Sequence, residues 1–204
     1  MLRKLIVFFV FSFVSLYVIL SPCPVSACGH EGIYLGLGYT QLFMYTPEKR
    51  MPPNGTRRVS FGPGYGLNFL VGYDFPNTRW GIQFPFEYAR MKLNKAEWIN
   101  YFGSSVEAVL HLVEWNNGFD FHLVGGAGWS FLSEGRFYDR SKSFGVTVGV
   151  GPGFSYYFSR TEKVSASVTF EMPVRYVHYF GDRLSRNGTS VVQFPVRISM
   201  QVGF

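Results

Sequence analysis

Apolar and polar residues alternate along the last stretch of the chain, residues 191–204, which reads VVQFPVRISMQVGF. Every even-numbered residue here is apolar, whereas Gln193, Arg197, Ser199 and Gln201 are polar or charged. Side chains of a β-strand point alternately to its two faces, so the pattern predicts a strand with one apolar and one polar face. Such a strand either covers the core of a soluble sheet or turns its apolar face to lipid and its polar face to the lumen of a barrel.

Seven further segments show the same period of two and are separated by turn signals. With the last stretch, the predicted strands are residues 32–44, 64–75, a third that starts at Trp80, 106–115, 119–131, 144–158, 164–180 and 191–204. Asn117 and Gly118 predict a two-residue type I′ turn, because Asn-Gly accepts a positive φ. Between the third and fourth strands we expect a connection of moderate length around residues 95–103. The connections then alternate between long and short, as in barrels with short turns on one side of a membrane and long loops on the other.

Aromatic residues gather at both ends of the predicted strands. Near the short turns lie Tyr73, Phe75, Trp80, Phe119, Phe158 and Phe204, and toward the long connections lie Tyr39, Tyr88, Trp129, Phe144 and Tyr176. The two interfaces of a bilayer favour two aromatic girdles that flank an apolar band. These features predict an all-β fold, an eight-stranded antiparallel up-and-down transmembrane β-barrel.

Composition and the N-terminus agree with this fold. Of the 204 residues, 16% are charged and 19% aromatic, and 23 are glycine, which is typical of an all-β domain with many strands. Beyond the N-terminus, no apolar run approaches the roughly 20 residues of a membrane helix. Residues 1–27 predict a cleaved secretory signal peptide, with Arg3 and Lys4 before an apolar segment and small residues at 25–27. The barrel domain is therefore predicted to span residues 28–204.

Cleavage after residue 27 would leave one cysteine, Cys28, because Cys23 would leave with the signal peptide. A single thiol cannot form an internal disulfide. The tetrad at residues 25–28, VSAC, fits an ordinary cleavage site followed by cysteine. It equally fits a bacterial lipoprotein box, in which Cys28 would be lipidated. Loss of Arg3 and Lys4 lowers the net charge from +6 to +4, a mild excess that suits contact with anionic surfaces but that solubility alone also explains.

Four prolines fall inside predicted strands, although a closed barrel has no edge strand to accommodate them. They are Pro85, Pro152, Pro173 and Pro195, and three of them stand two residues before an inward charge. We interpret them as bulges or locally widened ladders. The alternative is that some strands are shorter than their alternation indicates.

Four charged residues fall on faces predicted to line the lumen: Glu87, Glu171, Arg175 and Arg197. Glu171 and Arg175 lie four residues apart on one strand and point to the same side. Arg197 lies on the next strand, and Glu87 faces them across a lumen narrow enough for long side chains to meet. We predict that these four residues form a polar network that neutralises its own charges.

Histidines also face the predicted lumen. His111 and His122 lie on neighbouring strands, with Asp120 close by. A metal site needs three or four convergent ligands, and we interpret this group on flat adjacent strands as hydrogen-bonded filling of the lumen. No metal or other cofactor is predicted, and no glycine-rich loop that would hold a nucleotide phosphate precedes a helix.

The signal peptide, eight alternating strands, alternating connections and terminal Phe204 together resemble the small bacterial outer-membrane β-barrel family of the OmpA/OmpX type. The resemblance covers the whole mature chain but includes no motif that fixes a function. It implies insertion into the Gram-negative outer membrane by the barrel-assembly machinery, with Phe204 similar to the terminal assembly signal. Family members stabilise the envelope, act as adhesins or narrow channels, and in a few cases modify lipid A.

We expect a non-enzymatic protein with a structural or surface-interaction role, in contact with outer-membrane lipids, including lipopolysaccharide. Basic residues in the first long connection, Lys49, Arg50, Arg57 and Arg58, are candidate contacts for anionic sugars or phosphates, although solvation alone also explains them. The alternative function is a narrow channel for small solutes. Lipid A deacylases use a close His and Ser pair, but two residues after the outward His178 stands Phe180.

Overall fold

The computed structural model describes residues 31–46, 60–93, 97–115, 117–134, 142–160, 164–180 and 189–204. No helix in this part of the chain has the length and hydropathy of a membrane span. The described residues form β1 (Gly32–Tyr45), β2 (Gly64–Asp74), β3 (Trp80–Leu93), β4 (Glu97–Glu114), β5 (Phe119–Glu134), β6 (Lys142–Arg160), β7 (Ser165–Glu171), β8 (Val174–Phe180) and β9 (Thr189–Gly203).

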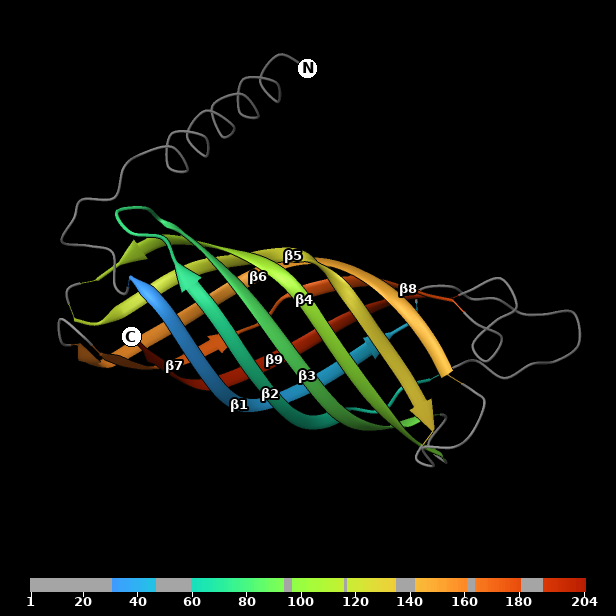
Figure 1. Cartoon of the computed structure of the whole chain (residues 1–204). Coiled ribbons are helices and arrows are strands. Elements are labelled where there is room, and N and C mark those ends of the chain that lie inside the picture. Colours follow the sequence, from blue (N-terminus) through green and yellow to red (C-terminus); the bar gives the residue numbers. More distant parts are fainter. Residues whose placement is uncertain are drawn as a thin grey trace, which may run out of the picture.

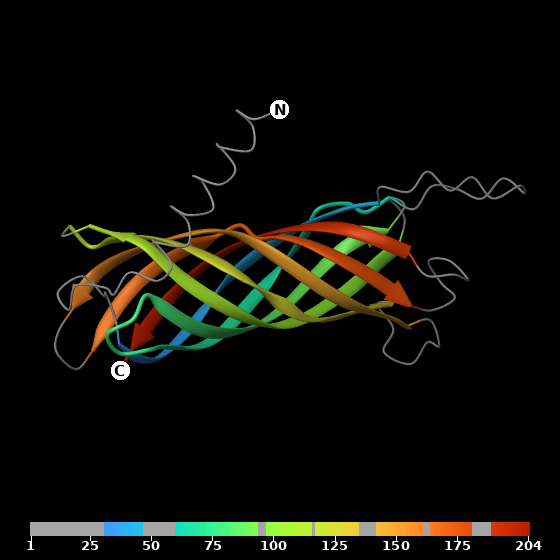
Figure 2. The same ribbon diagram turned by 90° about the horizontal axis from the view of Figure 1, so that it is seen from above.

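All nine strands belong to one antiparallel sheet that closes on itself (Figures 1 and 2). Each strand from β1 to β6 pairs with the next along the chain, and β9 pairs with β1 to close the ring. Both β7 and β8 pair with β6 on one side and with β9 on the other, so they are two halves of one barrel strand. The ring therefore closes through eight strands, and the predicted fold class is confirmed.

The two ends of the barrel differ in their connections. At one end, which we call the turn end, residues 75–79 and 115–118 join consecutive strands, and β1 begins where β9 ends. At the opposite, loop end, the chain passes from Tyr45 to Gly64 between β1 and β2. The expected alternation of lengths fails at one place. Instead of a moderate connection around residues 95–103, only residues 94–96 separate β3 from β4, because the alternation of buried and exposed side chains already begins beyond Glu97.

The prolines leave the strand register unchanged. The pairs Glu171–Arg197 and Arg175–Gln193 follow the same register, so Pro173 and Pro195 lie opposite each other at the break between β7 and β8. Two facing residues without an N–H leave the ladder locally unpaired. The widened-ladder interpretation therefore describes this break. The bulge interpretation is wrong, because the recorded register shifts lie at 111–113 and 157–159 instead.

The turn between β4 and β5 is longer by one residue than the Asn-Gly pattern predicts. The Trp115 N–H donates to the Phe119 carbonyl at 2.7 Å, and the Gly118 N–H donates to the Trp115 carbonyl at 3.0 Å. Three residues therefore lie between the closing pair. Gly118 is the last of them, with φ of +91°, a conformation that glycine adopts without strain.

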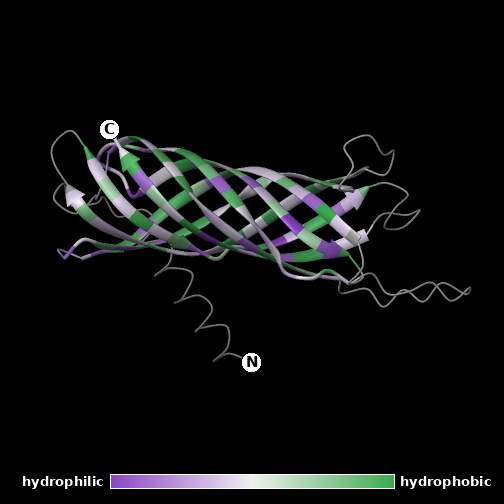
Figure 3. Ribbon diagram, turned by 90° about the horizontal axis from the view of Figure 1, so that it is seen from below, coloured by the Kyte–Doolittle hydropathy of each residue, from purple (hydrophilic) through white to green (hydrophobic). Residues whose placement is uncertain are grey.

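Burial alternates along the strands and separates two chemically different faces. The outward face carries exposed large apolar residues on every strand, for example Leu67, Val148 and Met200, each more than half exposed. The inward face carries the buried polar and charged residues. Figure 3 shows the resulting alternation of hydrophobic and hydrophilic positions along each ribbon. The prediction that the apolar face of each strand points outward is confirmed. A water-soluble barrel would show the opposite arrangement, with its apolar face toward the interior.

Candidate functional site

Five charged side chains meet in the lumen and form what we call the central cluster: Glu87, Glu107, Glu171, Arg175 and Arg197. They project from β3, β4, β7, β8 and β9, so the cluster exists only because the sheet closes. Each side chain is between 1% and 4% exposed. At this depth an unpaired charge would be costly, and every member has a partner of opposite sign.

Arg175 binds two of the carboxylates. Its Nη1 donates to Glu87 Oε2 at 2.6 Å and its Nη2 to Glu87 Oε1 at 3.1 Å, a two-pronged contact that matches the planar guanidinium to the carboxylate. The same Nη2 donates to Glu107 Oε1 at 2.8 Å. Arg175 therefore ties β8 to β3 and β4 across the lumen.

Arg197 binds the other side of the cluster. Its Nη2 lies 2.9 Å from Glu107 Oε2 and 2.9 Å from Glu171 Oε2, and its Nη1 lies 3.5 Å from Glu87 Oε1. Gln83 supports this arrangement, because its Nε2 donates to Glu107 at 2.9 Å and to Glu171 at 3.0 Å. Glu171 thus pairs with Arg197 rather than with Arg175, its neighbour along the strand.

The structure brings together all four residues of the predicted lumen network and adds a fifth, Glu107, which the prediction did not include. Glu107 contacts both arginines, and Ser105 Oγ donates to its Oε1 at 2.8 Å. The alternation of side chains along the strand is enough to indicate that Glu107 points inward. Its position between Arg175 and Arg197 depends on how the ring closes, which no local pattern specifies.

A second group, which we call the histidine cluster, lies toward the turn end. His111 Nδ1 and His122 Nδ1 lie 3.1 Å and 2.8 Å from the same oxygen, Asp120 Oδ2. On their other sides, His111 Nε2 lies 3.4 Å from Asp74 Oδ1, and His122 Nε2 lies 3.5 Å from Glu171 Oε1. Because Glu171 belongs to the central cluster as well, one chain of charged contacts runs from the turn end into the middle of the lumen.

Toward the loop end the lumen is apolar, which the sequence analysis did not predict. The buried apolar cluster there comprises Leu42, Met44, Ala89, Met91, Leu93, Ile99, Tyr101, Leu132, Val177, Tyr179 and Val191. The hydroxyls of its two tyrosines have partners inside the barrel: Gln193 Nε2 donates to Tyr179 Oη at 2.8 Å, and the Tyr101 hydroxyl donates to Gln193 Oε1 at 3.4 Å. The lumen is therefore filled by three layers, apolar, charged and histidine-containing.

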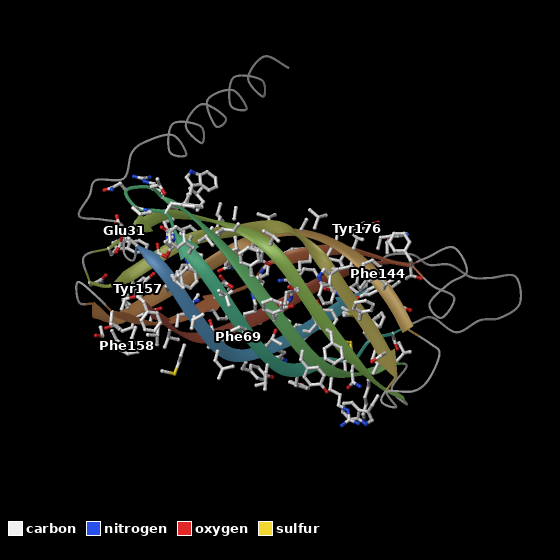
Figure 4. All side chains as sticks on the ribbon, in the orientation of Figure 1. Glu31, Phe69, Phe144, Tyr157, Phe158 and Tyr176 are labelled. Carbon is white, nitrogen blue, oxygen red and sulfur yellow. The ribbon has the colours of Figure 1, made fainter. Side chains whose placement is uncertain are left out.

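The outer wall carries an apolar belt between two aromatic girdles. Figure 4 shows Phe158 at the turn end, Phe144 and Tyr176 toward the loop end, and Phe69 between them. These four side chains are 40% to 52% exposed. An apolar surface that runs around the whole barrel is suited to lipid and not to water.

No protein-family model and no curated protein sequence matches the chain. Solved structures do match. Neisserial surface protein A is 16% identical, with a TM-score of 0.56, over 85% of this chain and 98% of that one. The outer membrane protein AlkL, solved in lipid bilayers, is 12% identical, with a TM-score of 0.52, over 90% and 94%. OprG of Pseudomonas aeruginosa is 15% identical, with a TM-score of 0.50, over 86% and 98%.

The chain has the fold of the small outer-membrane β-barrels. The likeness extends over nearly the full length of these structures, at identities that show the fold alone. The short connections of the turn end then correspond to the periplasmic turns of such barrels, and the loop end corresponds to their extracellular side.

In this outer-membrane β-barrel fold, a basic patch lies at the loop end on the outer wall. Lys92 pairs with Trp98 across β3 and β4, and Arg90 lies on the same face. The Lys92 ammonium and the Arg90 guanidinium each lie 5.0 Å from the centre of the Trp98 ring. Both contacts are within the range of a cation–π interaction. We call Arg90, Lys92 and Trp98 the rim patch.

A histidine and a serine meet on the outer wall of the barrel, also toward the loop end. His178 Nδ1 lies 3.1 Å from Ser190 Oγ across β8 and β9, and the Tyr176 hydroxyl donates to Ser190 Oγ at 2.6 Å. The serine comes from the next strand, β9, and not from position 180 of the same strand, where the chain has Phe180. In the described part of the barrel, however, no carboxylate contacts His178 to orient it as a catalytic base.

Several predicted features lie outside the described residues. They are the signal peptide at residues 1–27, the candidate lipidation site Cys28, and the first-loop residues Lys49, Arg50, Arg57 and Arg58. These remain predictions from the sequence.

Proposed function

We propose that this chain is a non-enzymatic barrel of the Gram-negative outer membrane whose lumen is sealed and whose extracellular rim and loops contact lipopolysaccharide and other surface partners. The observation that carries the proposal is the filling of the lumen. The central cluster closes the middle with buried ion pairs, and the apolar cluster closes the loop end. A protein with no open interior acts through its outer surfaces.

The sealed lumen argues against the alternative, a narrow channel. A channel needs a continuous path for water, whereas eight strands enclose a space that side chains fill. Here Arg197, Tyr101 and Tyr179 are among the largest fully buried side chains, and they block two successive levels of the lumen. Passage of a solute would require the ion pairs of the central cluster and the packing of the apolar cluster to open together.

We expect no stepwise conductance when the purified, folded barrel is added to a planar lipid bilayer. A large porin recorded in the same bilayer controls for insertion and detection, and heat-dependent migration on a gel verifies that the sample is folded. Reproducible single-channel steps from the folded protein would contradict a sealed lumen and favour the channel.

The rim patch supports contact with anionic lipid. Arg90 and Lys92 stand on the lipid-facing wall at the extracellular interface, where the phosphates of lipid A lie in an outer membrane. The ring of Trp98 holds both cations at the surface, since each lies 5.0 Å from its centre. A positive pair at that depth favours phosphate, because attraction to an anionic surface contributes about 1 kcal/mol per basic residue.

Binding of lipid A by the barrel in detergent micelles, measured calorimetrically, tests the rim patch. Because about 1 kcal/mol corresponds to about fivefold in affinity, Arg90→Gln and Lys92→Gln should each weaken binding about fivefold. The matched control is Arg79→Gln, which removes the same charge at the turn end. Equal affinity in all three variants and the parent would refute a role for the rim patch.

The remaining predictions belong to the same proposal. The barrel-assembly machinery inserts the chain, the four basic residues of the first loop extend the anionic contact surface, and Cys28 is either an ordinary first residue or a lipidated one. Metabolic lipid labelling of the parent and of Cys28→Ala distinguishes a lipidated Cys28 from an ordinary first residue.

The non-enzymatic assignment has its own test. If the barrel released fatty acid from lipid A, and Ser190→Ala abolished this release, the protein would be an esterase and the assignment would be wrong.

A further inference from the structure

We propose that His111, Asp120 and His122 form a binding site for a divalent transition-metal ion such as Zn²⁺, at the periplasmic end of the lumen. The three residues offer two imidazole nitrogens and a carboxylate, a donor set that suits zinc. One ligand atom from each lies within 4.8 Å of the others. The site goes beyond the proposed surface function and does not depend on it.

Two of the three donor–donor distances are close to those around a small tetrahedral ion. Ligand bonds of 2.0 to 2.2 Å around tetrahedral zinc place neighbouring donor atoms about 3.3 Å apart. In the structure, the two Nδ1 atoms stand 3.1 Å and 2.8 Å from Asp120 Oδ2. Because one ligand atom of each residue lies within 4.8 Å of the other two, side-chain movements would bring the three donors around one ion and leave the fourth position for water.

The histidines are also held as metal ligands usually are. A metal-binding histidine generally donates its second ring N–H to a carboxylate, which fixes the tautomer and turns the free lone pair toward the ion. Here Asp74 faces His111 Nε2 at 3.4 Å, and Glu171 faces His122 Nε2 at 3.5 Å. Both Nδ1 atoms face the same oxygen, Asp120 Oδ2, to which their N–H groups donate in the metal-free barrel, so that binding of Zn²⁺ would release these two protons to solvent.

Two features of the surroundings fit a ligand. Asp120 is 2% exposed, and its second oxygen, Oδ1, has no hydrogen-bond partner, so it is available for coordination. Gly153 makes room for the ring of His122, because a Cβ at this position would lie 2.1 Å from His122 Nε2. Entry is from the turn end, where the His111 side chain is 23% exposed while those of His122 and Asp120 are 4% and 2% exposed.

The test is a Zn²⁺ titration of the tag-free, folded barrel in detergent, by competition with a chromogenic chelator. We expect one ion per barrel. His111→Gln and Asp120→Asn should each weaken binding at least tenfold, and Asp74→Asn, which removes only the carboxylate behind His111, should weaken it by about 10- to 100-fold. His178→Gln is the matched control, since this histidine lies on the outer wall, and it should bind like the parent.

A second readout is the visible spectrum with Co²⁺ in place of Zn²⁺. A site with two nitrogens and a carboxylate oxygen should give the intense bands of a four-coordinate ion, and these should be absent in His111→Gln. Because His111 is at the partly exposed edge of the cluster, this variant is the one best suited to fold normally. No stoichiometric Zn²⁺ binding, or equal binding in His111→Gln and the parent, would overturn the proposal, as would loss of binding in His178→Gln.

Discussion

Replacement of Arg197 by methionine should lower the free energy of unfolding by about 3 to 5 kcal/mol, the typical cost of an unpaired buried charge. Arg197 is 1% exposed and contacts Glu87, Glu107 and Glu171. Without it, Glu171 would lose its guanidinium partner, and Glu87 and Glu107 would share Arg175. Methionine fills a similar volume, so the loss reports the missing charge more than a cavity. Equilibrium unfolding by urea in lipid vesicles, followed by tryptophan fluorescence, measures the change.

A double-mutant cycle shows whether the loss comes from ion pairing. Glu171→Gln and Arg197→Met should couple by at least about 1 kcal/mol, because Arg197 Nη2 lies 2.9 Å from Glu171 Oε2. The matched cycle pairs Glu171→Gln with Arg175→Met. Arg175 contacts Glu87 and Glu107 and has no recorded ion pair with Glu171 among the described residues, so this cycle should be close to additive. Additivity in both cycles would mean that water solvates the groups independently, as in an open pore.

The strands and their orientation were predictable because the two faces of each differ in chemistry. One face meets lipid and the other the lumen, so a period of two persists even where no soluble core exists. The connection between β3 and β4 was predicted to be too long, because small polar residues occur in the first half of β4. Asn100, Ser104 and Ser105 resemble loop residues by type, yet they belong to β4. Small polar residues suit a packed lumen as well as they suit a turn.

The sites were only partly predictable, because their geometry depends on which strands become neighbours when the ring closes. The inward phase of Glu87 and Arg175 followed from alternation, but their contact at 2.6 Å joins residues 88 positions apart in sequence. The pair of His178 and Ser190 was missed for a related reason. A histidine and serine motif within one strand can be read from the sequence, but here the serine lies opposite His178 on the next strand.

The apolar cluster at the loop end shows a further limit of the pattern. Met91, Ile99 and Val177 are apolar residues on the inward face, where alternation predicts polar ones. A lumen that water does not fill can bury either kind of residue, because apolar packing and satisfied ion pairs both close it. The pattern therefore distinguishes lipid from lumen well but does not distinguish a wet lumen from a dry one.

A basic residue in the middle of the outer wall should destabilise the barrel strongly. Val148 lies near the midpoint of β6 and is 57% exposed, between Ala127 and Tyr176 of the neighbouring strands. Val148→Arg should lower the free energy of unfolding in lipid vesicles by about 2 to 4 kcal/mol, the cost of arginine at the bilayer midplane on a barrel's lipid face.

The control is Val164→Arg, the same substitution at the turn end, where Val164 is 42% exposed. Near the interface the expected cost is only about 0 to 1 kcal/mol. Equal losses for both substitutions, or no loss for Val148→Arg, would show that this face does not lie in the bilayer.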